Sequence, residues 1–272
     1  MPLRSRVVLA IATLLAFSSS VGLSACGDGR TPASDSGTPG DGGSDAGITR
    51  TPICTAPAAV PCTDESVLDL ALFTAASSAN ITNTPEGAGF ATHVDATGGG
   101  FSPTQSYVYA RFTDTGLTRV DIGDEAAFDS MDWDIAFRRF VIRLNSGPSG
   151  PSCVSGARTA SGTDFDTLAA VPDALEYRTE EYYTGTCEMV PDGSGLMSPG
   201  VALQSFWEYP GCVQMSGNVY VIRLANGRRL KLTVTSYYEP AVQETCDTTG
   251  AIDMMTPSGA GNIRLRWAFL EP

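Results

Sequence analysis

The chain has 272 residues, of which 42% are hydrophobic and 17% are charged, and its formal net charge is −13 at pH 7. A chain of this length can bury one substantial core. The acidic balance argues against a partner bound through a phosphate backbone, because such binding depends on Lys and Arg side chains.

Residues 1–25 have the pattern of a secretory signal peptide. A short basic start precedes an apolar run over residues 7–17, which is too short for a spanning helix of roughly 20 apolar residues. The Leu-Ser-Ala-Cys sequence at 23–26 is similar to the lipobox of bacterial lipoproteins. The resemblance implies cleavage before Cys26 and acylation of that cysteine, and the acyl chains would be the only membrane anchor. The alternative is an ordinary signal peptide followed by a chance cysteine.

The segment from Cys26 to residue 52 is built from Gly, Ser, Thr, Asp, Pro and Ala, with almost no large apolar side chain. Such a segment cannot bury enough surface to offset its ordering entropy. We therefore expect residues 26–52 to form a lipidated, flexible tether and residues 53–272 to form a single domain. This organisation predicts an outer-membrane lipoprotein, at the cell surface or on the periplasmic face.

Six cysteines follow Cys26, and an even number in an exported chain indicates disulfides, with 15 pairings open. Cys54 and Cys62 are near neighbours, which favours a local bridge between them. The alternative for the other four is a zinc site, although no CxxC or CxxH spacing is present. These four are Cys153, Cys187, Cys212 and Cys246.

The patterns of the folded part predict an all-β, antiparallel domain with little helix. Residues 64–78 give mixed periodicity that allows one short helix. Alternation over 106–112, a turn cluster at 113–116 and a returning run over 117–122 predict two paired strands. Residues 133–144 are apolar on both parities, which predicts one long central strand whose facing changes near its arginines.

The C-terminal third contains the clearest hairpin signal. Apolar runs over 219–224 and 230–238 are joined through Asn226-Gly227, a pair that tolerates positive φ. Residues 263–269 alternate cleanly and predict a last strand. The region between the two strand-rich halves, residues 151–217, is called the insert here. We expect function in the insert, because binding residues tend to lie on loops held by a rigid scaffold.

The usual catalytic constellations are absent from the sequence. His93 is the only histidine, and it is expected in an exposed loop rather than as a ligand. Asp132 and Asp134, two residues apart on a strand, would face the same side and could form a carboxylate pair for glycoside hydrolysis. The alternative is a strand start with solvated or arginine-paired carboxylates.

Two blocks of sequence resemble the HmuY family of haem-binding lipoproteins. Residues 132–150, which begin Asp-Trp-Asp-Ile-Ala-Phe and end Ser-Gly-Pro-Ser-Gly, look like the family's signature, and residues 220–238 are similar to its C-terminal hairpin. The resemblance covers about residues 104–270 and implies a hand-shaped, antiparallel β fold. It also implies haem or a related porphyrin as the cofactor and binding without catalysis. The best-known members take haem from host haemoproteins and pass it to an outer-membrane receptor.

The best-known member ligates the haem iron with two histidines in the region corresponding to the insert, where this chain has none. Some relatives use methionines, and thioether sulfur is an accepted axial ligand. The resemblance therefore points to Met189 and Met215 as the metal ligands. A bridge between Cys187 and Cys212 would bring the two methionines together, whereas another pairing would separate them. Met197 is expected to matter less, because glycines make its loop freer; any of the three can instead fill a core gap.

Other residues of the insert are candidates for the walls and rim of such a site. Tyr177, Tyr182 and Tyr183 are further iron-ligand candidates, with ordinary aromatic packing as the alternative. The cofactor-binding residues predicted for the porphyrin ring and its propionates are Phe206, Trp207, Tyr183, Arg158 and Arg178, with Tyr209 as a further wall residue. Two alternatives to haem binding stay open: an interaction or structural lipoprotein with the same fold, and a glycan-directed enzyme using Asp132 and Asp134.

Overall fold

A computed structural model describes residues 51–100, 102–253 and 257–271. The predicted signal peptide, Cys26 and nearly all of the predicted tether lie outside the described residues. Two antiparallel sheets dominate the described part, which confirms the predicted fold class.

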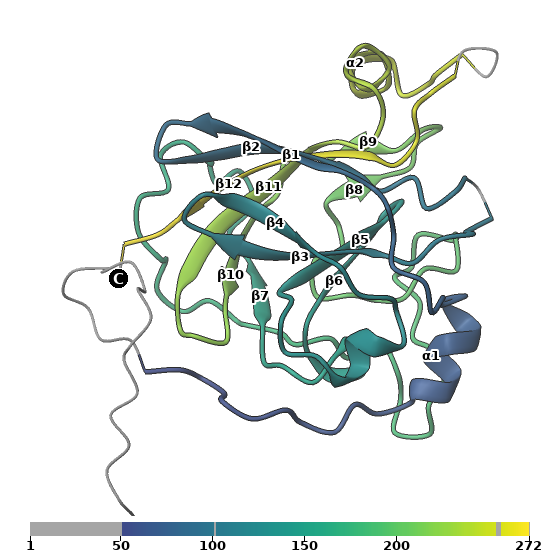
Figure 1. Cartoon of the computed structure of the whole chain (residues 1–272). Helices are drawn as coiled ribbons and strands as arrows, with labels where there is room; N and C mark the ends of the chain where they lie inside the picture. Colours follow the sequence, from purple (N-terminus) through teal and green to yellow (C-terminus); the bar gives the residue numbers. More distant parts are fainter. Residues whose placement is uncertain (1–50, 101, 254–256, 272) are drawn as a thin grey trace, which may run out of the picture. The chain divides into compact units, whose positions relative to one another are not determined.

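The larger sheet has six strands, and its order shows how the two ends of the domain meet. The C-terminal strand β12 lies between β2 and β11, and β7 forms one edge (Figure 1). Every neighbouring pair in the sheet is antiparallel. In sheet order the strands are β1 (Ile81–Glu86), β2 (Gly89–Asp95), β12 (Asn262–Phe269), β11 (Arg229–Ser236), β10 (Val219–Arg223) and β7 (Ser155–Arg158).

The second sheet has four strands, and a separate small ribbon has two. The four strands, in sheet order, are β4 (Gly116–Val120), β3 (Val108–Thr113), β5 (Ile135–Arg138) and β6 (Val141–Leu144). The ribbon pairs β8 (Trp207–Glu208) with β9 (Gln214–Met215). Single 3-10 turns cover Ala126–Asp129 and Gly147–Ser149.

Two α-helices occur in the described residues. Helix α1 spans Thr63–Asp69, much less than the 64–78 that the sequence allowed. Helix α2, Pro240–Thr249, was not predicted. It begins with a proline, whose fixed φ suits the first turn, and ends at Gly250 in the left-handed conformation.

The prediction of one long strand over residues 133–144 is wrong. The segment is a hairpin of β5 and β6, in which Arg138 pairs with Val141 across the turn residues Arg139 and Phe140. Arg139 has a φ of 52°, so the backbone reverses where the sequence analysis expected only a change of facing. The predicted hairpin at Asn226-Gly227 is confirmed, and Gly227 has the positive φ that the turn requires.

The four-stranded sheet carries apolar side chains at both odd and even positions of its strands because both of its faces are covered. One face packs against the six-stranded sheet and forms the main core, which includes Val108, Phe112 and Ile135. The other face forms a second core around Tyr109 and Trp133, covered by the segment after α1 and by part of the insert.

A buried polar cluster lies on this second face. The guanidinium groups of Arg138 and Arg143 lie over the Tyr107 ring, at 4.1 and 3.9 Å from its centroid. The Asp124 carboxylate accepts hydrogen bonds from the Tyr107 N–H and the Tyr109 hydroxyl, and it lies 3.7 Å from Arg138. Asp124 thus offsets part of the buried positive charge, whereas Nε and Nη1 of Arg143 have no hydrogen-bond partner among the described residues.

All six cysteines after Cys26 form disulfides, as predicted, but the pairing differs from the expected one. The bridges are Cys54–Cys153, Cys62–Cys187 and Cys212–Cys246. The local Cys54–Cys62 bridge is therefore wrong. Backbone hydrogen bonds from Ile53 to Ala225 and from Ala58 to Pro151 hold the first segment against distant parts of the chain, so its cysteine meets a distant partner.

Candidate functional site

Three cavities in the insert adjoin one another, and together they are called the insert pocket. The first and second have volumes of about 350 Å³ each and share Arg178, Ala202 and Gln204. The third, about 240 Å³, shares Asp192 and Gly193 with the second and Ser205 with the first. Ligand sites in proteins are concave and of this order of size.

Two arginines predicted to bind propionates meet at the first cavity. Arg158 ends β7 opposite Tyr220 of β10, and Arg178 forms a β-bridge with Gly156 two residues before Arg158. Both side chains are exposed and line the cavity, with Glu176 beside them. The edge strand therefore brings together residues 20 apart in the sequence.

The charge on these two arginines is not neutralised by an ion pair. Six other arginines form ion pairs with carboxylates, whereas neither Arg158 nor Arg178 does so among the residues that the structure describes. Burial raises the pKa of the neighbouring Tyr220 hydroxyl, and the Arg158 guanidinium opposes that shift. A cavity with two free guanidinium groups suits a ligand with carboxylates.

The aromatic residues predicted as ring walls are divided between the pocket and the cores. Trp207 lines the third cavity beside Tyr209, whose side chain is 54% exposed. Phe206 is buried in the main core. Tyr183 packs against the second core and donates a hydrogen bond to Asp69 at the end of α1. Only Trp207 and Tyr209 of this set line the insert pocket.

The bridge between Cys187 and Cys212 that would bring the two methionines together does not form, because these cysteines pair with Cys62 and Cys246. The argument that placed Met189 beside Met215 therefore fails. Met189 is half-buried against the second core, and Met215 is half-buried against the main core.

Met197 is instead the exposed methionine of the insert, with 74% of its surface accessible. The sequence analysis expected the loop of Met197 to be free, but the loop is closed. A β-bridge between Pro191 and Pro199 closes it, and the Asp192 N–H donates to the Ser198 carbonyl. The opposite arm of this hairpin, with Gly193, lines the second and third cavities. The hairpin that carries Met197 thus borders the insert pocket, but Met197 itself lines none of the three cavities.

The tyrosines considered as iron ligands are poorly suited to form phenolates. Tyr182 is buried and shares a hydrogen bond with the Ser149 hydroxyl, and burial raises its pKa. Burial also raises the pKa of Tyr177, which lies under the Arg223 guanidinium. Iron ligation by tyrosine needs the deprotonated oxygen, so these shifts disfavour it.

Asp132 and Asp134 do not share an environment, contrary to the expectation of a common face. Asp132 is exposed and forms an ion pair with Arg111. Asp134 is 8% exposed and accepts the Phe112 N–H, and burial raises the pKa of its carboxyl to about 6. His93, expected in a loop, lies in β2 and hydrogen-bonds to Asn262.

The raised pKa of Asp134 gives a testable pH dependence. A carboxyl whose pKa is raised on folding stabilises the fold most when neutral, and that contribution is lost as pH rises from 3.8 to about 6. The loss amounts to about 3 kcal/mol. Relative to the parent, Asp134→Asn should therefore gain unfolding free energy as pH rises through this window, measured by urea titration. A constant difference between the two proteins across the window would contradict the assignment.

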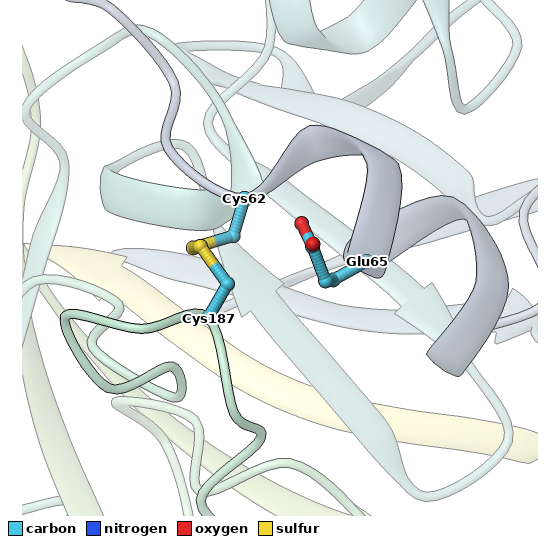
Figure 2. Close-up of side chains that lie close together, drawn as sticks. All are labelled: Cys62, Glu65 and Cys187. Atoms are coloured by element: carbon cyan, nitrogen blue, oxygen red, sulfur yellow. A yellow bond between two sulfur atoms is a disulfide. The ribbon is translucent and has the colours of Figure 1, made fainter. Parts of the chain in front are cut away.

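One group of metal-ligating side chains is found within the described residues. The ligand atoms of Cys62, Glu65 and Cys187 lie within 4.8 Å of one another. Figure 2 shows the two sulfur atoms joined, with Glu65 of α1 beside them. Zinc binds thiolates, and the disulfide removes them. The bridged cysteines thus tie α1 to the insert rather than hold an ion.

Comparison with known proteins gives a family and several distant structural likenesses. A family model described as HmuY protein matches residues 103–249. A candidate lipoprotein of Bacteroides fragilis has 15% sequence identity and a TM-score of 0.43, over 70% of this chain and 95% of that chain. A candidate HmuY-like haem-binding protein of Bacteroides vulgatus has 16% identity and a TM-score of 0.42, over 68% and 93%. The apo form of an HmuY analog of Tannerella forsythia has 17% identity and a TM-score of 0.38, over 72% and 100%.

No curated protein matches the chain. In the part of the chain that the structure describes, no helix has the length and apolar character needed to cross a membrane.

Proposed function

Because this chain belongs to the HmuY family, we propose that it is a non-catalytic, lipid-anchored protein that binds haem or a related porphyrin outside the cytoplasm. The observation that carries the proposal is the first cavity of the insert pocket. There Arg158 and Arg178 form no ion pair with any described residue of a strongly acidic chain. The two carboxylates of a porphyrin fit that pair of guanidinium groups, which can each bind a carboxylate through two hydrogen bonds.

The remaining parts of the pocket fit the rest of the ligand. Tyr209, which is 54% exposed, offers apolar surface to an aromatic ring at the third cavity. Trp207 also lines this cavity but is 8% exposed and belongs to the main core. Met197 offers an accessible sulfur on the hairpin that borders the second and third cavities. Haem, when bound, supplies an iron that accepts axial ligands, and thioether sulfur is one of them. We assign Met197 as the ligand in place of Met189 and Met215, which pack against the two cores.

The proposal is tested by titrating the mature domain with ferric haem and following the Soret band. We expect saturable binding at micromolar haem. A lack of binding at that concentration would remove the haem proposal and favour the second candidate, an interaction module with the same fold. The absence of histidine from the insert is the observation that favours this second candidate.

Met197→Ala should weaken ferric haem binding by about tenfold or more, ~1.4 kcal/mol, and should shift the Soret band. The cause is loss of the sulfur ligand, which tunes the electronic state of the iron. The matched control is Leu196→Ala, which removes an exposed apolar side chain from the same hairpin and leaves the sulfur in place. Equal effects of the two substitutions would assign Met197 an apolar contact and not a ligand role.

Anchoring is tested separately at Cys26, the predicted lipidation site. Cys26→Ser should leave the protein in the aqueous phase of a detergent partition, whereas the parent should enter the detergent phase, because the acyl chains are the expected anchor. A variant that still enters the detergent phase would contradict lipidation at this position. The haem titration is a separate measurement on the mature domain and does not test lipidation.

A further inference from the structure

One tyrosine of the insert pocket has an accessible hydroxyl. Tyr209 follows β8 directly, lines the third cavity and is 54% exposed. Its hydroxyl forms no hydrogen bond with any residue that the structure describes. Tyr220, which lines the first cavity, instead donates its hydroxyl to the Gln204 carbonyl at 2.7 Å. The third cavity thus holds a phenol oxygen that the fold does not use.

The turn that carries Tyr209 is fixed on both sides. Strands β8 and β9 pair before and after it. Within the turn, Cys212 forms a disulfide with Cys246 of α2, the helix beside β9 (Figure 1). A Cβ placed on Gly211 would lie 2.6 Å from the Gly250 carbonyl oxygen, so the turn packs directly on the end of α2. A rigid backbone of this kind suits a residue that must meet a ligand atom at a fixed position.

The two ends of the insert pocket differ in charge. Arg158 and Arg178, with Glu176, give the first cavity a net positive charge. The third cavity is lined by Asp192 and Glu208 and by no lysine or arginine. Ferric haem has carboxylates at one edge and a net positive charge at its centre, because the porphyrin dianion cancels only two of the three charges of the iron. Coulomb attraction therefore favours carboxylates at the first cavity and iron toward the third.

We propose that the Tyr209 phenolate is an axial ligand of ferric haem iron in the insert pocket. The inference rests on the proposed function and deepens it by adding a second ligand. Tyrosine oxygen is an established ligand of haem iron. On binding, an Fe–O bond forms and the hydroxyl proton passes to water, as deprotonation of a metal ligand requires. Haem iron has two axial positions, so this assignment is compatible with that of Met197.

The charge of a phenolate makes such a ligand selective for the oxidation state of the iron. A phenolate cancels the net positive charge of ferric haem, which a neutral thioether leaves in place. Ferrous haem has no net charge at its centre, so the same phenolate would leave an uncompensated negative charge beside Asp192 and Glu208. Tyr209 should therefore strengthen the binding of ferric haem and not that of ferrous haem.

The test is Tyr209→Phe, which keeps the aromatic ring at the third cavity and removes only the hydroxyl. We expect the affinity for ferric haem, measured by Soret titration, to fall by at least about tenfold. The visible charge-transfer band from phenolate to ferric iron should be lost, and the reduction potential of the bound haem should rise. Iron-free protoporphyrin, followed by fluorescence, should bind the parent and the variant alike.

The matched control is Tyr177→Phe, the same chemical change at a tyrosine of the insert that lines none of the three cavities. It should bind ferric haem like the parent and keep the charge-transfer band. The unfolding free energy of Tyr209→Phe, measured by urea titration, should equal that of the parent, because no hydrogen bond with a described residue is lost.

The outcomes separate this ligand from the proposed function. Ferric haem binding by the parent without a charge-transfer band, or equal binding by Tyr209→Phe, would overturn the ligand role and leave Tyr209 as a wall of the pocket. Weaker binding of iron-free protoporphyrin by the variant would also overturn it, because the hydroxyl would then contact the porphyrin and not the iron. A parent that binds neither haem nor protoporphyrin would reject the proposed function together with the ligand.

Discussion

The double substitution Arg158→Gln, Arg178→Gln is expected to lower the affinity for ferric haem by roughly 100-fold, about 1.5 kcal/mol for each charge-assisted hydrogen-bonding group removed. Both side chains are exposed without the ligand, so their loss should leave the unfolding free energy almost unchanged. The substitutions lower the stability of the haem complex and not that of the free protein, because the ligand covers the guanidinium groups and removes water from the contact. The measurement is a Soret titration of the two proteins at constant ionic strength.

Arg119→Gln is the matched control for charge. Arg119 forms an ion pair with Asp121 at the end of β4 and does not line the insert pocket. It should bind haem like the parent. A mesoporphyrin dimethyl ester, which lacks free carboxylates, should bind the parent and the double variant alike. Loss of ester binding in the double variant would show that the arginines support the pocket wall and do not recognise carboxylates.

The sequence was sufficient to predict elements whose turn residues or alternation of apolar and polar residues lie within a few neighbouring positions. The β10–β11 hairpin follows from Asn226-Gly227, and β12 follows from its strict alternation. Strand β2 escaped prediction because Phe90 and Val94 are its only large apolar residues and its burial depends on β12 across the sheet. Helix α2 escaped because its residues are mostly polar and only Gln243 and Cys246 are buried.

The candidate site depended on contacts between distant segments, and these could be predicted only in part. Arg158 and Arg178 were selected for their charge, but their meeting at one cavity needs the β-bridge between Gly156 and Arg178. Six cysteines allow 15 pairings, and the pairing determines which loops lie together. The sequence therefore could not show which methionine of the insert is exposed. Met197 resembled a mobile-loop residue because the bridge between Pro191 and Pro199 is formed by backbone atoms, which leave no side-chain signature.

The Cys62–Cys187 bridge is the one between the most distant cysteines, 125 residues apart, and it fixes α1 to the insert. Helix α1 has seven residues and no side-chain cap at Cys62. A helix this short does not form by its own propensity. Its remaining links to the insert include the hydrogen bond from Tyr183 to Asp69 and the packing of Val67 on the second core.

Replacing Cys62 and Cys187 together by serine should lower the unfolding free energy by about 4 kcal/mol, between the values of ~3 for a 15-residue loop and ~4.7 for a 100-residue loop. The intermediate value follows because Cys54–Cys153 remains and shortens the path between the two positions. Urea titration under non-reducing conditions measures the loss. The control Leu68→Ser, at a position on α1 that is 79% exposed, should change the unfolding free energy little.

The double cysteine variant should still bind ferric haem at urea concentrations well below its unfolding midpoint. The β-bridges Gly156–Arg178 and Pro191–Pro199, which shape the insert pocket, are independent of Cys62. Loss of binding with the fold intact would instead make this disulfide part of the binding site.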